Sequence, residues 1–208
     1  MGEPLLTGWI REHRLEEAAP GVLASALARA RIPKRFWSAD PLAVKGDTRW
    51  VQKALAKPEK WAGEGYGFFI HGAFNTGKSA AAAIFARDFV MRCHVVVWVA
   101  VRDVPAIRFH EGEMAAVDAM LKRADLLVLD DLGSERFRLE SAAGAALEEV
   151  VRIMYESRRP TIITSNKSWE EFRATYSTAF VSLVRRVSVP VALTDPWDEG
   201  PTLSGVRS

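Results

Sequence analysis

The sequence contains little cysteine and has no long apolar run. Its 208 residues include a single cysteine, Cys93, so no disulfide framework can form within the chain. No apolar run reaches the ~18 to 20 residues that a membrane-spanning helix needs, and the opening stretch has no signal-peptide pattern. These absences exclude a disulfide-stabilised secreted scaffold and an integral membrane protein. We therefore expect a cytoplasmic protein.

A large excess of charge of one sign is also absent. The 28 lysines and arginines nearly balance the 26 aspartates and glutamates, which leaves a net charge of +2. This balance neither demands nor excludes a nucleic-acid partner, because local patches decide such binding. Apolar residues make up 49% of the chain, which is enough for the core of one domain of this length.

What the sequence does contain is a phosphate-binding loop at residues 72–79, which read Gly-Ala-Phe-Asn-Thr-Gly-Lys-Ser. The two glycines let the backbone curl so that successive N–H groups point at one anion. Lys78 supplies a charge for the outer phosphates, and the Ser79 hydroxyl is a ligand for Mg²⁺. A helix that begins here adds its positive N-terminal end. The residues expected to bind ATP or ADP are Gly72, Asn75, Thr76, Gly77, Lys78, Ser79 and Ala80.

Strand and helix patterns alternate around this loop. Apolar runs predict strands at residues 66–71, 94–100, 125–129, 160–164 and 187–193. Helical spacing predicts helices at 5–31 with a break at Pro20-Gly21, and at 47–57, 80–91, 103–123, 139–157, 168–175 and 178–186. Continuous apolar strands joined by helices indicate an α/β domain with a parallel sheet covered on both faces. Pro190 places the last strand at an edge of the sheet.

Polar residues follow two of the predicted strands, at the end where open α/β sheets bind ligands. Asp130 and Asp131 follow an apolar run, and Asn166 follows the strand at 160–164. Beside a phosphate loop, Asp130 would hold Mg²⁺ and Asp131 would orient or deprotonate an attacking water. Asn166 can position that water or contact the terminal phosphate. Taken alone, the acids could merely cap a strand, and Asn166 could serve a turn.

Basic residues gather in three further places. Arg29, Arg31, Lys34 and Arg35 form a small cluster that is either a solvated loop or a contact with nucleotide or DNA. The pair Arg185-Arg186 ends a predicted helix, where a cation also offsets the helix dipole. The candidates for DNA contact, with a solvated helix surface as the alternative, are Arg102, Arg108, Lys122 and Arg123.

Five segments taken together carry a resemblance to a known family. They are the phosphate loop, Leu-Leu-Val-Leu-Asp-Asp-Leu-Gly-Ser-Glu at 126–135, Thr-Ile-Ile-Thr-Ser-Asn at 161–166, the late arginine pair, and Ile-Pro-Lys-Arg-Phe at 32–36. This set resembles the AAA+ ATPases of the DnaC/IstB branch, and the last segment is similar to the entry of bacterial and phage DnaC-type helicase loaders into their ATPase domain. The resemblance implies a P-loop NTPase fold with a five-stranded parallel sheet in the order 5-1-4-3-2. The chain departs from the family in its short helical N-terminal segment, which stands in place of the extended N-terminal region of some loaders.

The resemblance also implies roles for individual residues. ATP would bind between neighbouring subunits of a homo-oligomer, and Arg186, with Arg185 in reserve, would complete the site of the next subunit. Asn166 matches the family's sensor position, and Ile32 and Pro33 would lie near the adenine. Residues 1–31 would be a helical segment that grips a partner, 32–194 the ATPase domain, and 195–208 a loose tail.

Two departures from the family pattern bear on function. Ala73-Phe74-Asn75 fill the middle of the loop, where AAA+ proteins usually have Pro-Pro-Gly, and Asp131 stands where most have glutamate. The shorter acid fits slow hydrolysis. We expect an ATPase that delivers a hexameric replicative helicase to single-stranded DNA. The alternatives are an IstB-like transposition helper, a nucleotide-gated binding module with little hydrolysis, and, with least support, a small-molecule phosphotransferase.

Overall fold

A five-stranded sheet organises the part of the chain that the computed structural model describes, residues 21–39, 49–104, 119, 121–135 and 141–194. Its strands are β1 (Gly67–His71), β2 (Val96–Ala100), β3 (Leu126–Leu132), β4 (Thr161–Ser165) and β5 (Ser188–Ala192). Every neighbouring pair is parallel, and the strand order is β2-β3-β4-β1-β5. The predicted fold class and the order 5-1-4-3-2 are therefore confirmed, with β5 at an edge.

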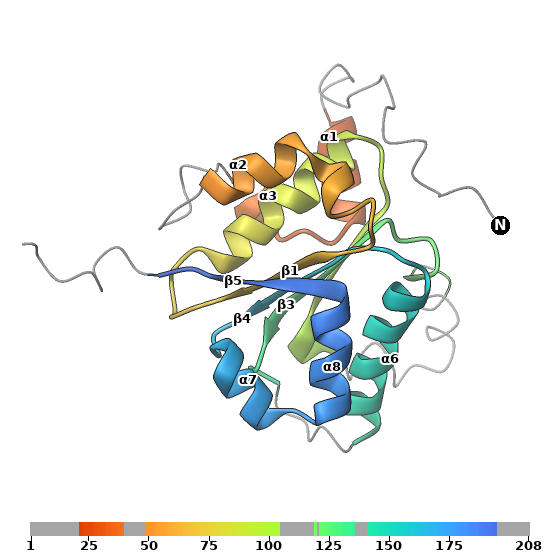
Figure 1. Ribbon diagram of the computed structural model, residues 1–208. Helices are drawn as coiled ribbons and strands as arrows, with labels where there is room; N and C mark the ends of the chain where they lie inside the picture. Colours follow the sequence, from red (N-terminus) through yellow and green to blue (C-terminus); the bar gives the residue numbers. More distant parts are fainter. Residues whose placement is uncertain (1–20, 40–48, 105–118, 120, 136–140, 195–208) are drawn as a thin grey trace, which may run out of the picture.

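Helices cover both faces of this sheet (Figure 1). One face carries α1 (Val22–Arg29), α2 (Arg49–Ala56) and α3 (Lys78–Met91), and the other carries α6 (Ala142–Glu156), α7 (Trp169–Thr175) and α8 (Thr178–Val187). Because successive strand residues point to opposite faces, each strand feeds two cores. Phe68 and Ile70 pack with α3, whereas Phe69 packs with Phe172 of α7. The remaining turns are η2 (Lys34–Phe36), η4 (Pro58–Lys60) and η5 (Val101–Asp103).

Helix α3 is the element that fixes the phosphate loop. Its first half is rich in alanine, the best helix former, and these small side chains let it lie close to the sheet. Phe85 and Phe89 are fully buried against the ring of Trp61, at 5.5 Å and 5.6 Å between ring centroids. A helix anchored on this aromatic cluster holds its N-terminus at one place above the sheet.

The chain before the phosphate loop also packs onto this face. Leu27 and Ala30 are buried in the same core as Phe85. The N–H of Trp98 in β2 donates to the carbonyl of Ala30 at 3.0 Å, so this segment covers the outer edge of the sheet. The described part of the predicted N-terminal segment therefore packs onto the core of the α/β domain itself, while residues 1–20 lie outside the described part.

The other differences from the sequence predictions are local. The strand predicted to end at residue 129 continues to Leu132 through an irregular stretch described below. The strand predicted from residue 94 begins at Val96. Most of the predicted helix at 103–123, including Arg108, and the tail at 195–208 lie outside the described residues.

Among the helices of the described residues, none combines the length and the apolar character that crossing a bilayer requires.

Candidate functional site

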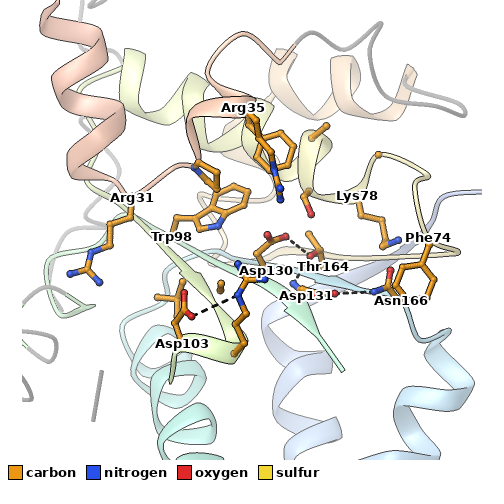
Figure 2. A pocket seen from close by; sticks show the side chains of 18 of the residues that line it. Arg31, Arg35, Phe74, Lys78, Trp98, Asp103, Asp130, Asp131, Thr164 and Asn166 are labelled. Carbon is orange, nitrogen blue, oxygen red and sulfur yellow. Dashed lines mark hydrogen bonds and ion pairs between the residues drawn. The ribbon is translucent and has the colours of Figure 1, made fainter. Parts of the chain in front are cut away.

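The carboxyl ends of β2, β3 and β4 and the loop after β1 surround a cavity of about 760 Å³ (Figure 2). It brings together residues that are far apart in the sequence but were predicted as one site. Of the predicted site residues, those lining it are Pro33, Asn75, Gly77, Lys78, Ser79, Ala80, Asp130, Asp131 and Asn166.

The backbone of the phosphate loop has the curled form that the sequence predicts. Asn75, a residue type that tolerates the left-handed conformation, adopts it (φ 64°), and so does Gly77 at the start of α3 (φ 90°). Gly72 has φ 148°, and a Cβ atom there would lie 2.1 Å from the carbonyl oxygen of Leu193. Gly72 therefore lets the loop leave β1 against the chain that follows β5.

Lys78 is held close to this loop. Its ammonium donates to the carbonyl of Ala73 at 2.5 Å and to the hydroxyl of Thr76 at 3.5 Å, and the residue is only 7% exposed. Burial lowers the pKa of Lys78, and the nearby carboxylates of Asp131 and Asp130 act in the opposite direction. Thr76, which does not line the cavity, supports the loop by donating its hydroxyl hydrogen to Ala73.

An irregular stretch of β3 turns two consecutive acids into the cavity. The register between β3 and β4 shifts between Leu129 and Leu132, and Asp131 is left-handed with φ 68°. In a regular strand adjacent side chains face opposite sides, whereas a bulge re-aims one of them. Asp130 and Asp131 both line the cavity as a result. Aspartate is one of the few residues that adopt the left-handed conformation readily.

Thr164 at the end of β4 joins the two acids. Its hydroxyl donates to Oδ1 of Asp130 at 2.8 Å and accepts from the backbone N–H of Asp131 at 2.8 Å. Thr164 is buried and lines the cavity, yet it was not among the predicted site residues. Its position at the end of a predicted strand, two residues before Asn166, was the available signal.

Asp130 and Ser79 form the pair that fits a divalent cation. Asp130 is 7% exposed, and burial raises the pKa of its carboxyl, while hydrogen bonds from Ser79 and Thr164 lower it in part. A buried carboxylate in contact with a hydroxyl offers the oxygen ligands that Mg²⁺ prefers, and phosphate oxygens and waters usually complete its coordination. These residues therefore fit the ion that the sequence predicts.

Asp131 is oriented by the predicted sensor. The side-chain amide of Asn166 donates to Oδ1 of Asp131 at 2.9 Å. The carboxylate of Asp131, which lines the cavity, is thus held in one direction, and among the described residues its second oxygen accepts no hydrogen bond.

Arg186 lies at the other end of the sheet. It precedes Ser188, which pairs with Gly67 at the start of β1, whereas the phosphate loop follows the end of β1. Its guanidinium lies 5.7 Å from the ring centroid of Tyr155 and donates to the Tyr155 hydroxyl at 3.4 Å. Arg186 does not reach the cavity of its own chain.

The side chain of Ile32 belongs to the buried core and does not line the cavity, whereas Pro33 does. Three further arginines line it: Arg31 and Arg35, from the cluster for which a nucleotide contact was one of the alternatives, and Arg102, which was a candidate for DNA contact. Sequence spacing could not place them here, because the contact between Ala30 and β2 depends on the folded sheet.

Solved structures share this fold. The crystal structure of DnaI aligns with a TM-score of 0.66 at 20% identity, covering 81% of this chain and 97% of that chain. The crystal structure of the DnaC helicase loader aligns with a TM-score of 0.64 at 21% identity, covering 77% and 99%. The structure of AMPPCP-bound DnaA from Aquifex aeolicus aligns with a TM-score of 0.58 at 21% identity, covering 70% of this chain and 44% of that chain. At such identities the likeness is one of fold.

A comparison of sequence families goes further. The family model described as "IstB-like ATP binding protein" matches residues 44–184, which is more than half of the chain. No significant match is found among curated proteins. The matched range includes the phosphate loop, both acids of β3 and Asn166, so the predicted membership in the DnaC/IstB branch of AAA+ ATPases is confirmed. The chain therefore belongs to the family of IstB-like ATP-binding proteins.

Proposed function

We propose that this protein is an ATPase that loads a replicative helicase onto single-stranded DNA and uses ATP to set its assembly state. The observation that supports an ATP-dependent activity is the convergence of the phosphate loop, Asp130, Asp131 and Asn166 on one cavity. The observation that favours loading is the likeness to DnaI and to the DnaC helicase loader over nearly the whole of those chains.

The phosphates of ATP would lie on the loop and the N-terminus of α3. Backbone N–H groups of residues 75–80 and the ammonium of Lys78 bind the negative charge, and the positive end of the helix adds to it. Ser79 and Asp130 hold Mg²⁺. When bound, this ion neutralises charge on the phosphate oxygens. The loop, the start of α3 and the end of β3 carry these residues.

Hydrolysis would depend on Asp131. Its carboxylate accepts the proton of an attacking water, and Asn166 keeps that carboxylate in one orientation. The left-handed backbone and the short side chain limit its reach toward that water. We therefore propose slow turnover that a partner or DNA accelerates.

The subunits would associate head to tail around the nucleotide. Arg186 lies at the end of the sheet away from the cavity, so it can act only on a neighbouring chain. Phe74, which lines the cavity and is 75% exposed, offers an apolar contact for that neighbour. Such a heterologous interface repeats the same contact between successive copies.

The deciding experiment measures deposition of the host's hexameric helicase on single-stranded DNA. We expect faster deposition with the protein and ATP, and a complex with the helicase that mass measurement detects. If the protein neither stimulates deposition nor binds the helicase, the loader function is wrong.

A second candidate is a transposition helper that polymerises on duplex DNA, and the matching IstB-like family model favours it. It predicts filaments on duplex DNA that require ATP, and electron microscopy tests for them. Filaments without any effect on helicase deposition would replace the loader function with this one.

A further inference from the structure

The cavity contains arginines that the phosphate loop does not explain. Arg31, Arg35 and Arg102 line it, but they differ in direction (Figure 2). The guanidinium of Arg35 points down toward Asp130, whereas the side chain of Arg31 points away from it. Arg102 lies 3.7 Å from the carboxylate of its neighbour Asp103. Arg35 is therefore the arginine directed at the predicted phosphate and Mg²⁺ site.

A rigid support carries Arg35. Its guanidinium lies 4.7 Å from the ring centroid of Phe36, and that ring packs on Trp98 of β2 at 6.1 Å. The backbone N–H of Trp98 donates to the carbonyl of Ala30. The indole N–H of Trp37 donates to the carbonyl of Ile32 at 2.8 Å. These contacts tie η2 to the edge of the sheet and fix the backbone of Arg35 beside the cavity, while its exposed side chain lies over Phe36.

The guanidinium of Arg35 has hydrogen-bonding capacity to spare. Within the described residues it forms no hydrogen bond and no ion pair, although it carries five N–H donors. Its charge is felt by Asp130: burial, the main influence, raises the pKa of that carboxyl, and Arg35 contributes a small lowering. A planar fork of donors beside an anion site matches the geometry of phosphate oxygens.

We propose that Arg35 binds the terminal phosphate of ATP held in the same chain and makes the cavity prefer the triphosphate over the diphosphate. This inference rests on the proposed ATP site and names a residue that acts within one subunit, in addition to the arginine supplied by a neighbour. The preference follows from position, since Asp130 and Lys78 lie at the end of the loop where the outer phosphates bind. The segment that precedes β1 would then respond directly to the presence of the terminal phosphate.

The test compares the dissociation constants of a non-hydrolysable ATP analogue and of ADP, each with Mg²⁺, measured by calorimetry. Arg35→Gln keeps much of the side chain over Phe36 but removes the charge. We expect this variant to weaken binding of the ATP analogue about 10- to 100-fold, the loss usual for a charged hydrogen bond. Binding of ADP should weaken less than about 3-fold. Arg35→Lys should recover part of the affinity, because a point charge replaces the fork.

Lys34→Ala is the matched control, since Lys34 lies in the same turn, over the ring of Trp37, and does not line the cavity. It should leave both constants unchanged, and melting temperatures check that all variants fold. If Arg35→Gln weakens the binding of the ATP analogue and of ADP by the same factor, or weakens neither, the inference is overturned.

The wild type separates this inference from the proposed function. If it binds the ATP analogue with an Arg35-dependent preference but fails to load a helicase, only the loader function is wrong. If it binds neither nucleotide, both are wrong.

Discussion

At the scale of single residues, Asp131 combines an unusual backbone with a proposed catalytic role. Its φ of 68° is easy for aspartate and asparagine and costly for longer side chains. We expect Asp131→Asn to fold normally and to bind ATP as the wild type does, because the backbone and the contact with Asn166 are compatible with asparagine. Turnover should fall at least ~100-fold, the usual contribution of a general base. A steady-state ATPase assay beside a binding measurement tests this, and unchanged turnover would favour the nucleotide-gated binding module.

The same backbone explains why a longer acid is not expected to help. Asp131→Glu restores the residue that most AAA+ proteins have, but it places glutamate in the left-handed conformation. We expect a loss of ~1 kcal/mol in the free energy of unfolding, measured by urea denaturation. Turnover should not rise above that of the wild type. A faster and equally stable variant would show that side-chain length, and not the backbone, limits hydrolysis.

Asp130 links stability to pH. Because burial raises the pKa of its carboxyl in the folded state, the proton is held more tightly there than in the unfolded chain. Stability from this group is therefore complete below the unfolded value of 3.8 and is lost as pH rises through the folded pKa. Asp130→Asn should stabilise the nucleotide-free protein at pH 7, by about 0.5 to 2 kcal/mol, and abolish Mg²⁺-dependent ATP binding.

Thermal unfolding between pH 4 and 8 measures this effect, and the gain of Asp130→Asn should shrink toward the acidic end. Glu149→Gln, an exposed position on α6, is the control and should show no such trend. A gain that is independent of pH would mean that packing, and not the charge of Asp130, sets the difference.

At the scale of elements, the junction of β1 and α3 is tightly constrained. Gly72→Ala would force a Cβ against the carbonyl of Leu193, in addition to the strain of a φ of 148°. We expect the free energy of unfolding to fall by ~2 to 3 kcal/mol and nucleotide binding to weaken. Gly21→Ala is the control: it shares a positive φ of 99° but would meet no atom within 4 Å, so only backbone strain of ~1 kcal/mol should remain. If urea denaturation shows the same loss of unfolding free energy for both variants, the steric argument is contradicted.

The elements also show what the sequence could predict. The strands were predictable because apolar runs bounded by polar residues reflect burial on both faces, and the phosphate loop because its spacing reflects backbone geometry. The bulge at Asp131 and the role of Thr164 were not, since a register shift depends on the pairing of β3 with β4. The position of Arg35 depends in the same way on the contact between Ala30 and β2.

At the scale of the whole molecule, the two ends of the sheet carry different parts of the proposed ATP site. The cavity lies at the carboxyl ends of the strands, and Arg186 lies at the opposite end beside the start of β1. One chain therefore cannot unite them, whereas a head-to-tail neighbour can. We expect Arg186→Ala to reduce turnover by ~1,000-fold or more and to leave ATP binding intact. A loss of this size is usual when an arginine that stabilises the transferred phosphoryl group is removed.

Mixing two inactive variants tests whether the arginine acts between chains. Lys78→Ala loses ATP binding but keeps Arg186, whereas Arg186→Ala keeps the cavity. In a random equal mixture about a quarter of the interfaces unite an intact cavity with an intact arginine, so about a quarter of the wild-type activity should return. Arg185→Ala should remain active alone. If mixed oligomers form but no activity returns, Arg186 does not serve the neighbouring site, and the head-to-tail arrangement loses its main support.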